Sequence, residues 1–307
     1  MDKIFQKFCD IYPHYKINTK LKRKFFYVIF KIFEKFLKGP FKLNFSKFLF
    51  LAYPQKNNYS RSLLNKAVLH DEGYLTFFLN NIDNKSIFID CGANQGFYTI
   101  PIAASNPDCV VYAFEPSLQE MEYLNKNIEL NNFKNVRSFD LGIGDVEGSF
   151  NFLNDNLEKD STKGGLIIEN TKGNLNEVKK IKVKTIDKIV EDYIDINSNS
   201  KIFIKIDIEG YDINAVYGAK NIINKYTTII LVEFSTMAVA SKIYSKQHFS
   251  DFLDENSLII LDVFGKEYTL DDLHLQLDSL KDNNKVCGNY LIIKKGLIKQ
   301  LNFNKSL

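Results

Sequence analysis

The sequence contains few cysteines and no long hydrophobic run, and both shortages exclude classes of protein. Its 307 residues include four cysteines, Cys9, Cys91, Cys109 and Cys287, with no CxxC spacing and no histidine paired to form a zinc site. This argues against a zinc site and a disulfide framework, so we expect a reducing, cytoplasmic compartment. The largest apolar run near the N-terminus covers residues 25–30, whereas a transmembrane helix needs ~20 apolar residues. We expect neither a transmembrane helix nor a secretory signal.

Arginine is also scarce, and the positive charge is unevenly distributed. Only three of the 40 basic residues are arginines, and arginine is the preferred side chain for bidentate recognition of phosphate and guanine. We therefore expect no nucleic-acid partner. Residues 1–50 hold twelve Lys and Arg against three Asp and Glu, a net charge of +9, which leaves −6 on the remaining 257 residues.

The basic N-terminal segment predicts an amphipathic helix over about residues 20–38. Its apolar residues recur at helical spacing, with lysines between them, and Gly39-Pro40 predicts its end. Such a helix either packs on the body of its own protein, which we favour, or makes peripheral contact with the inner face of a membrane. The expected apolar stripe consists of Leu21, Phe25, Val28, Ile29, Ile32 and Phe36.

From residue 87 onward, short apolar runs alternate with helical segments. The expected strands are residues 87–90, 110–115, 201–207 and 228–233, and the expected helices are residues 98–104, 118–130 and 214–223. This alternation predicts an α/β fold with a mostly parallel sheet and helices on both faces. We expect a β-hairpin insertion within residues 136–186, and a helix at 249–255 with strands at 258–263 and 289–293 to complete the sheet. The expected domains are an N-terminal helical extension, residues 1–60, and a catalytic domain, residues 61–307.

Residues 87–99 contain the most informative motif. A strand ending at Asp90 runs into a turn with Gly92, Asn94 and Gly96 and then, after Phe97, into a helix. Such a turn places backbone N–H groups and a helix N-terminus around a nucleotide-like cofactor. The acid at the strand end suits a cationic ligand better than a pyrophosphate. S-adenosylmethionine, with its ammonium and sulfonium groups, is therefore the expected cofactor.

The next expected strand ends at Glu115 and Pro116, about 25 residues after Asp90. An acid at this position can accept both hydroxyls of an adenosine ribose. The alternative for Glu115 is a charge at a helix N-terminus, since Pro116 and Ser117 resemble a capping sequence. Asp140 is a weaker candidate, for the adenine amino group, and is otherwise a turn residue.

Charged residues interrupt the expected strand at 201–207. Alternation places Lys205, Asp207 and Glu209 on one side of a strand that should be buried, and buried charges need partners or a function. We expect Asp207 to be the general base or to orient an acceptor hydroxyl, with Glu209 as its rival and Lys205 as the third candidate catalytic residue. A structural ion pair from Lys205 to one of these acids is the alternative. Glu233 is expected at the same rim.

Four blocks together resemble the FkbM-type methyltransferases, a class I family that uses S-adenosylmethionine. They are residues 89–96 (IDCGANQG), 114–116 (FEP), 141–148 (LGIGDVEG) and 204–212 (IKIDIEGYD). Cys91 departs from the family, which often has valine there. The resemblance covers about residues 70–293 and implies a Rossmann-like fold and O-methylation of a hydroxyl, with a sugar, glycan or related small molecule as acceptor. It does not extend to residues 1–60.

Two other functions remain open at this point. A nicotinamide-dependent oxidoreductase or epimerase shares this type of fold, although the sequence lacks its GxGxxG turn. A non-catalytic, membrane-associated module would depend on the basic helix instead. Nothing predicts a resident metal, but carboxylates at one rim could hold a divalent ion. His70 is a candidate neighbour of the acceptor, with a surface or capping role as the alternative. The oligomeric state is not predicted.

Overall fold

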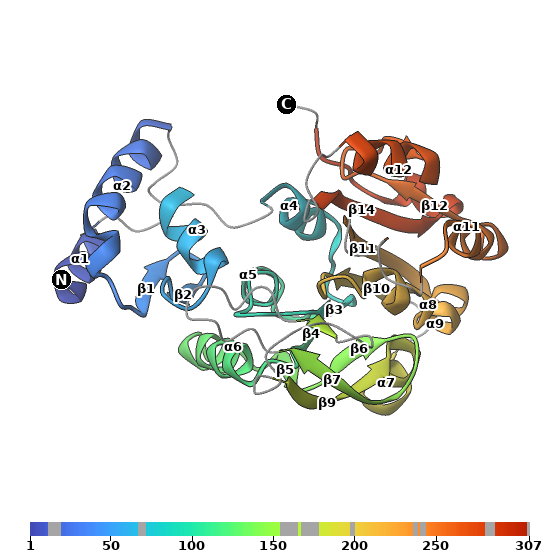
Figure 1. Cartoon of the computed structure of the whole chain (residues 1–307), viewed down its shortest axis with the longest axis horizontal. Coiled ribbons are helices and arrows are strands. Elements are labelled where there is room, and N and C mark those ends of the chain that lie inside the picture. Colours follow the sequence, from blue (N-terminus) through green and yellow to red (C-terminus); the bar gives the residue numbers. More distant parts are fainter. Residues whose placement is uncertain are drawn as a thin grey trace.

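The central element of the structure is an eight-stranded sheet (Figure 1). The computed structural model describes residues 1–11, 20–66, 72–153, 165–166, 178–196, 200–235, 239, 244–279 and 286–305. The strand order is β13-β12-β14-β11-β10-β3-β4-β5. The strands are β3 (Ile87–Cys91), β4 (Val110–Phe114), β5 (Val136–Phe139), β10 (Lys201–Ile206), β11 (Thr227–Ser235), β12 (Leu258–Leu261), β13 (Glu267–Tyr268) and β14 (Val286–Lys294).

Five of these strands, β5, β4, β3, β10 and β11, are neighbours and run parallel. β14 pairs antiparallel with β11 and with β12, so β12 runs in the same direction as the parallel strands. All five residues of β3 and five of six in β10 are buried, as expected for strands covered on both faces. The predicted α/β fold is confirmed.

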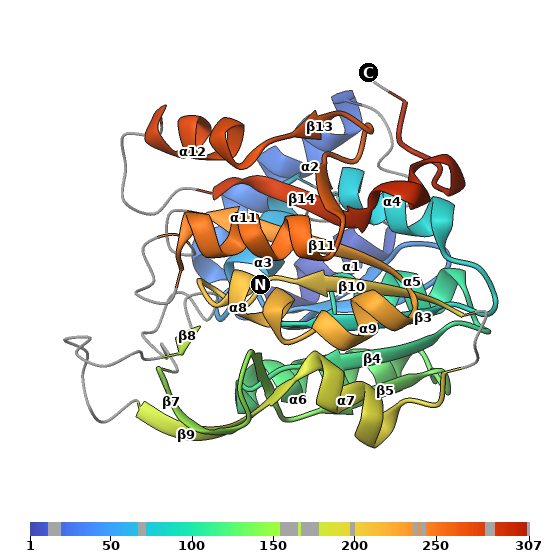
Figure 2. The same cartoon turned by 90° about the vertical axis from the view of Figure 1, so that its right-hand side faces the viewer.

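Helices cover both faces of the sheet, and side-chain alternation explains how (Figure 2). On one face, Ile87 and Ile89 of β3 and Ile204 of β10 pack in a cluster with helices α7–α9, α11 and α12. On the other face, Phe88 and Phe203 pack against helices α4 and α5. The helices are α4 (Glu72–Asn81), α5 (Thr99–Ser105), α6 (Leu118–Leu130), α7 (Ile186–Tyr193), α8 (Asp212–Tyr217), α9 (Lys220–Lys225), α11 (Lys246–Glu255), α12 (Leu270–Ser279) and the 3₁₀ helix η5 (Lys295–Gln300).

A second sheet forms where the hairpin insertion is expected. Its order is β6-β9-β7-β8, with β6 (Gly142–Gly144), β7 (Gly148–Leu153), β8 (Gly165–Leu166) and β9 (Val178–Thr185). The antiparallel pair β7 and β9 is the predicted hairpin, while β6 adds to β9 in parallel. The connection between β7 and β9 lies outside the described residues except for β8, as does His70.

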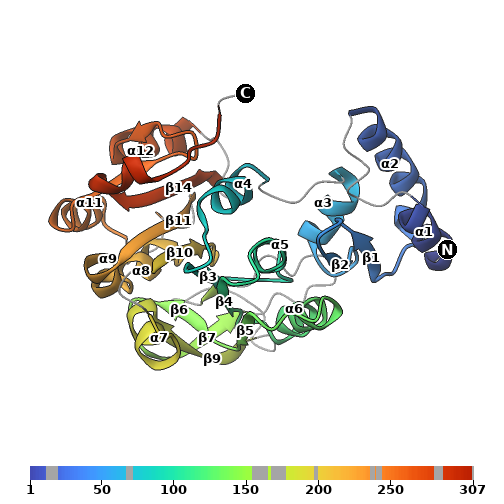
Figure 3. The same cartoon turned by 180° about the vertical axis from the view of Figure 1, so that it is seen from behind.

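The N-terminal segment packs beside α5 and α6, at the end of the molecule opposite α11 and α12 (Figures 1 and 3). It comprises α1 (Asp2–Ile11), α2 (Lys20–Phe33), the 3₁₀ helix η2 (Glu34–Phe36), β1 (Phe41–Asn44), β2 (Leu49–Ala52) and α3 (Asn58–Lys66). The outward backbone N–H groups of β2 donate to α6: Leu49 N to Asn131 Oδ1 at 2.7 Å and Leu51 N to Asn127 Oδ1 at 2.6 Å. Side-chain amides thus satisfy the edge of this small sheet. None of the described helices is long and apolar enough to cross a bilayer.

α2 packs on the protein through residues other than the predicted stripe. Phe26 and Phe30 are its buried side chains, and they join Phe5 of α1 and Phe41 of β1 in one apolar cluster. Of the predicted stripe, Ile29 is half-buried, whereas Leu21, Phe25, Val28, Ile32 and Phe36 are exposed. The prediction of packing was therefore right for the helix and wrong for these five residues. The apolar side chains of α2 cover a wider sector than the helix buries, and the sequence pattern did not show which half packs against the rest of the protein.

We expect Phe30→Ala to destabilise the protein by about 3–5 kcal/mol, because Phe30 is fully buried and its removal leaves a cavity among rings. Ile32→Ala on the same helix is the control, and because Ile32 is largely exposed we expect it to change stability by less than about 0.5 kcal/mol. Urea unfolding of the full chain measures both. Equal stability of the two variants would show that the N-terminal cluster does not contribute to the folded core.

Candidate active site

The sequence-predicted acids meet at the carboxyl ends of β3 and β10. From β3 the chain continues to β4 and β5 on one side of the sheet, and it returns later to β10 and β11 on the other side. The strand order therefore reverses at β3, and ligands of open α/β sheets bind in the crevice outside such a switch point. Asp90 lies beside Lys205 in strand register, and Asp207 follows β10 directly.

Asp90 is buried and only partly satisfied. Its Oδ2 accepts hydrogen bonds from Thr99, 2.6 Å from the hydroxyl and 3.2 Å from the backbone N, which ties the end of β3 to the start of α5. Its Oδ1 accepts no hydrogen bond from the described residues and lies 3.8 Å from Lys205 Nζ. Burial raises the pKa of Asp90, and the Lys205 ammonium opposes that shift. The carboxylate therefore retains unused capacity for a positively charged partner.

Lys205 is the cation that connects the site. Its Nζ donates to Gly92 O at 3.1 Å, lies 3.2 Å from Asp207 Oδ2, and stands 5.4 Å from the centre of the Tyr98 ring. The structural ion pair that was the alternative to catalysis is thus present, and it includes two acids rather than one. Because Lys205 is itself buried, these partners compensate for the loss of its hydration.

A tight turn after β10 presents Asp207 at the rim. The Asp212 carboxylate accepts from Ile208 N and Gly210 N, each at 2.9 Å, and so closes the turn. Glu209 adopts a left-handed backbone conformation with φ 56° within it. The Asp207 side chain is 20% exposed, unlike Asp90. Sequence reasoning assigned no role to Asp212, because its hydrogen bonds reach back to residues that precede it in the turn.

The two glycines of the first turn are required by contacts within the protein. A Cβ on Gly92, at φ 77°, would lie 2.0 Å from the Asp207 carbonyl oxygen. A Cβ on Gly96, at φ 94°, would lie 2.8 Å from Ile100 and 2.9 Å from Leu124. Gly92 therefore lets the loops after β3 and β10 approach each other, and Gly96 lets α5 and α6 pack over the turn.

Glu115 is placed between the turn and α6. Its Oε2 accepts from Asn94 N at 2.9 Å and its Oε1 from Ser117 N at 2.8 Å, and each oxygen keeps a further acceptor position. Burial raises its pKa to about 7, partly opposed by these two backbone hydrogen bonds. Pro116 lies between these contacts, and Ser117 is the N-cap of α6. Both sequence interpretations of Glu115 are thus compatible with its position, because the residue organises the helix start and retains acceptor capacity.

Carboxyl groups outnumber cations around this rim. Burial raises the pKa of Asp212 to about 6 and that of Glu233 to about 9, and for both the neighbouring Asp207 adds to the shift. Glu233 of β11 follows Val232, the register partner of Ile206, so it lies at the same edge as Asp207. Among the residues that the structure describes, no three His, Cys, Asp or Glu side chains are grouped to hold a metal ion. The excess of acid favours a cationic ligand.

The side chains of two further predicted cofactor residues have other surroundings, and their role in cofactor binding stays a prediction. The Phe97 ring packs against Phe50 and Tyr59 of the N-terminal segment, at centroid distances of 5.0 and 5.7 Å. Asp140 is exposed in the connection between β5 and β6. Neither side chain joins the cluster of Asp90, Lys205 and Asp207.

Sequence reasoning also missed the support of the turn by the N-terminal segment. Asn57 Nδ2 donates to Asn94 Oδ1 at 2.7 Å, and Ser60 Oγ to Gln95 Oε1 at 2.5 Å. Asn127 of α6 holds the same turn by donating to Gln95 O at 3.0 Å. Asn57 and Ser60 lie outside any motif, and no sequence signal predicts these long-range contacts.

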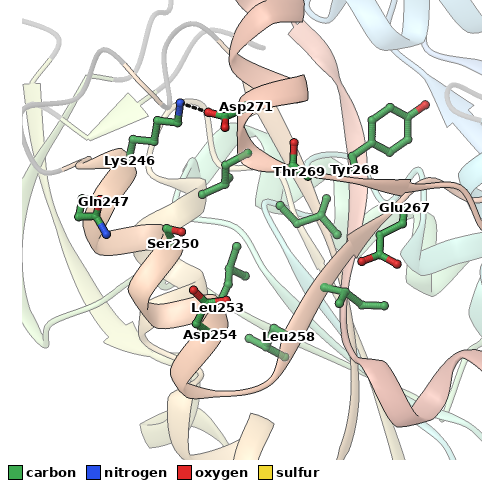
Figure 4. A pocket seen from close by; sticks show the side chains of 13 residues that line it. Lys246, Gln247, Ser250, Leu253, Asp254, Leu258, Glu267, Tyr268, Thr269 and Asp271 are labelled. Carbon is green, nitrogen blue, oxygen red and sulfur yellow. Dashed lines mark hydrogen bonds and ion pairs between the residues drawn. The ribbon is translucent and has the colours of Figure 1, made fainter.

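A separate cavity of about 740 Å³ lies at the far edge of the sheet, between α11, β12, β13 and α12 (Figure 4). Lys246 and Asp271 form an ion pair at one side of it. β14, β11 and β10 separate β12 from β3, so this cavity lies apart from Asp90 and its neighbours.

A mostly parallel α/β sheet with a glycine turn and acids at its switch point is typical of enzymes that bind a nucleotide-like cofactor. The family model "Methyltransferase FkbM domain" matches residues 90–262, more than half of the chain. The protein therefore belongs to the FkbM methyltransferase family, and it is a methyltransferase that uses S-adenosylmethionine. Family membership decides against the nicotinamide-dependent alternative.

Three solved structures are distantly similar to this chain. A putative methyltransferase from Streptococcus mutans in complex with S-adenosylhomocysteine is 14% identical, with a TM-score of 0.39 and coverage of 71% of this chain and 93% of that one. M. jannaschii TYW2 in complex with AdoMet is 14% identical, with a TM-score of 0.37 and coverage of 82% and 84%. A precorrin-6y C5,15-methyltransferase from Geobacter metallireducens is 9% identical, with a TM-score of 0.36 and coverage of 74% and 94%. No curated protein matches the chain.

Removal of the Lys205 charge is expected to destabilise the folded protein. Lys205→Met should reduce the free energy of unfolding at pH 7 by about 3–5 kcal/mol, because Asp90 and Asp207 lose the cation between them. Asp90→Asn in the same chain should recover part of that loss, since it removes one of the two uncompensated charges. The control is Lys225→Met at an exposed lysine of α9. Strictly additive effects in a urea-unfolding cycle would contradict the pairing of Lys205 with Asp90.

Glu115 should make stability depend on pH. Its folded-state pKa of about 7 lies above the ordinary 4.5, so its stabilising contribution is complete below about pH 4.5 and is lost as the pH rises to about 7. In Glu115→Gln we expect the decline in unfolding free energy between pH 5 and 8 to shrink by up to about 3 kcal/mol. Glu129→Gln, at an exposed glutamate of α6, should leave the decline unchanged. Identical pH profiles for wild type and Glu115→Gln would contradict the raised pKa.

Proposed function

We propose that the protein transfers the methyl group of S-adenosylmethionine to a hydroxyl oxygen of a sugar, glycan or related small molecule in the cytoplasm. The observation that carries this proposal is the position of Asp207. It is a partly exposed carboxylate at the carboxyl end of β10, held by a buried lysine next to the glycine turn. The resemblance in the 204–212 block supports an oxygen acceptor.

The residues at the switch point fit the cofactor. Asp90 Oδ1 accepts no hydrogen bond from the described residues and would face the positively charged methionine end, directly or through a water molecule. Gly92, Asn94 and Gly96 shape the turn beside it, and Glu115 would accept the ribose hydroxyls with the capacity that its two backbone hydrogen bonds leave. The bound cofactor supplies a methyl group on a good leaving group, a sulfonium.

Asp207 would take the proton of the acceptor hydroxyl. A sugar hydroxyl is a poor nucleophile until a base accepts its proton, and a positioned carboxylate typically contributes 10²–10⁴-fold. The Lys205 ammonium, 3.2 Å from Asp207 Oδ2, fixes the position of the Asp207 side chain. Glu209 remains the rival base, because the turn closed by Asp212 presents both residues. Lys205 acts in this scheme as a positioning residue.

Placement of the acceptor would supply the rest of the acceleration. Methyl transfer needs the acceptor oxygen in line with the methyl carbon and the sulfur. Holding both reactants in this alignment makes the step effectively unimolecular and so lowers its entropic barrier. The buried strands β3 and β10 hold Asp90 and Lys205 in register, so these two side chains are fixed relative to each other by the sheet itself.

We expect Asp207→Asn to lower turnover by about 10²-fold or more while changing the dissociation constant for S-adenosylmethionine by less than about threefold. The assay incubates the full chain with methyl-labelled S-adenosylmethionine and a panel of free sugars, nucleotide sugars and oligosaccharides, and mass spectrometry then locates the added methyl group. Calorimetry measures cofactor binding.

The control is Asp251→Asn, at an exposed aspartate of α11, which should retain full turnover. Full turnover in Asp207→Asn would remove Asp207 from the mechanism. Methyl groups found on nitrogen instead of oxygen would overturn the choice of acceptor, and absence of cofactor binding in the wild-type chain would overturn the proposal as a whole.

A further inference from the structure

α2 carries more apolar surface than the protein uses for its own packing. At 3.6 residues per turn, its apolar side chains cover a sector of roughly 200°, about twice the width of an ordinary core-facing stripe. Phe26 and Phe30 occupy the buried half of this sector. The other half is 46–79% exposed and consists of Leu21, Phe25, Val28 and Ile32, continued by Phe36 of η2.

The exposed half continues onto α1. The Phe8 and Phe25 rings meet across the two helices with centroids 6.1 Å apart. Ile4 and Ile11 lie one turn before and after Phe8 on the same side of α1, and both are exposed. Together these residues form one surface, which we call the α1–α2 face. It lies at the end of the molecule remote from α11 and α12 (Figures 1 and 3).

Positive charge accompanies this face. Lys20, Lys22 and Lys24 are exposed at the start of α2, between and beside its exposed apolar residues. The first 50 residues carry a net charge of +9, while the rest of the chain carries −6. A helix with apolar residues on one side and lysines beside them is typical of a segment that lies in the interface of an anionic bilayer.

We propose that the α1–α2 face docks on the surface of an anionic phospholipid membrane, at its inner, cytoplasmic leaflet. Leucine, isoleucine, valine and phenylalanine side chains would enter the boundary between headgroups and acyl chains, and each lysine near the surface adds about 1 kcal/mol of attraction to anionic lipid. A second copy of this chain is a poorer occupant, because two such faces would bring two segments of charge +9 together. The proposal is independent of the methyl acceptor.

The test is cosedimentation of the full chain with vesicles of phosphatidylcholine and phosphatidylserine, and with vesicles of phosphatidylcholine alone. We expect binding to the anionic vesicles that weakens as salt is added, and much weaker binding to the neutral ones. The variant Leu21→Asp/Ile32→Asp should lose about tenfold or more in affinity for the anionic vesicles, because two inserting side chains become charged.

Three controls make the result specific. Leu275→Asp places the same charge at a leucine of α12 that is as exposed as those of the α1–α2 face, and it should bind as the wild type does. Lys20→Gln/Lys24→Gln should weaken binding to anionic vesicles only. Thermal unfolding should be unchanged in all variants, since every replaced side chain is exposed.

Several outcomes would overturn the proposal. One is wild-type protein that stays in solution with anionic vesicles at low salt. Another is undiminished binding of Leu21→Asp/Ile32→Asp. Light scattering, which measures the mass of the protein in solution, tests for a dimer. If the wild type is a dimer that Ile32→Asp dissociates, and it binds no lipid, then the α1–α2 face joins two copies of the chain instead.

Discussion

The arrangement of the site depends on the buried ammonium group of Lys205. It contacts a backbone carbonyl of the first turn, the acid at the end of β3 and the acid after β10, so it joins the two loops that meet at the switch point. A buried charge of this kind is costly unless it is surrounded by partners, and two of the partners here are Asp90 and Asp207, the residues proposed to bind the cofactor and to act as the base. Gly92 makes the contact possible, because only a residue without Cβ lets the Asp207 carbonyl approach the turn.

The carboxyl groups around Lys205 explain why a cationic cofactor suits this fold. Burial raises the pKa of Asp90, Asp212, Glu115 and Glu233, and Lys205 compensates for only part of the negative charge that they would carry. A sulfonium and an ammonium would supply the missing positive charge at the rim. Two opposite electrostatic characters therefore coexist in one chain: a cluster of acidic side chains at the switch point and a basic N-terminal segment.

The N-terminal segment has an exposed face and also contacts the glycine turn at the switch point. α3 packs beside α2, and Asn57 and Ser60 at its start hold the side chains of Asn94 and Gln95 in the glycine turn after β3. α6 contributes from the other side through Asn127, which also satisfies β2. The conformation of the turn thus depends on polar residues from two other parts of the chain, the start of α3 and α6, whose side chains hydrogen-bond to it.

The sequence by itself determined the parallel α/β sheet, the glycine turn after Asp90, the family and the positions of Lys205 and Asp207, because strand alternation and motif spacing are local properties. Tertiary structure alone decided what these residues touch. In the folded chain Lys205 has two acidic partners. Phe97 packs in the N-terminal cluster, and Asp140 is exposed. Asn57 and Ser60 hydrogen-bond to the turn after β3, and Asp212 to the turn after β10. Tertiary structure also chose which half of the apolar sector of α2 is buried, since periodicity gives the direction of a side chain on its helix but not the neighbour that covers it.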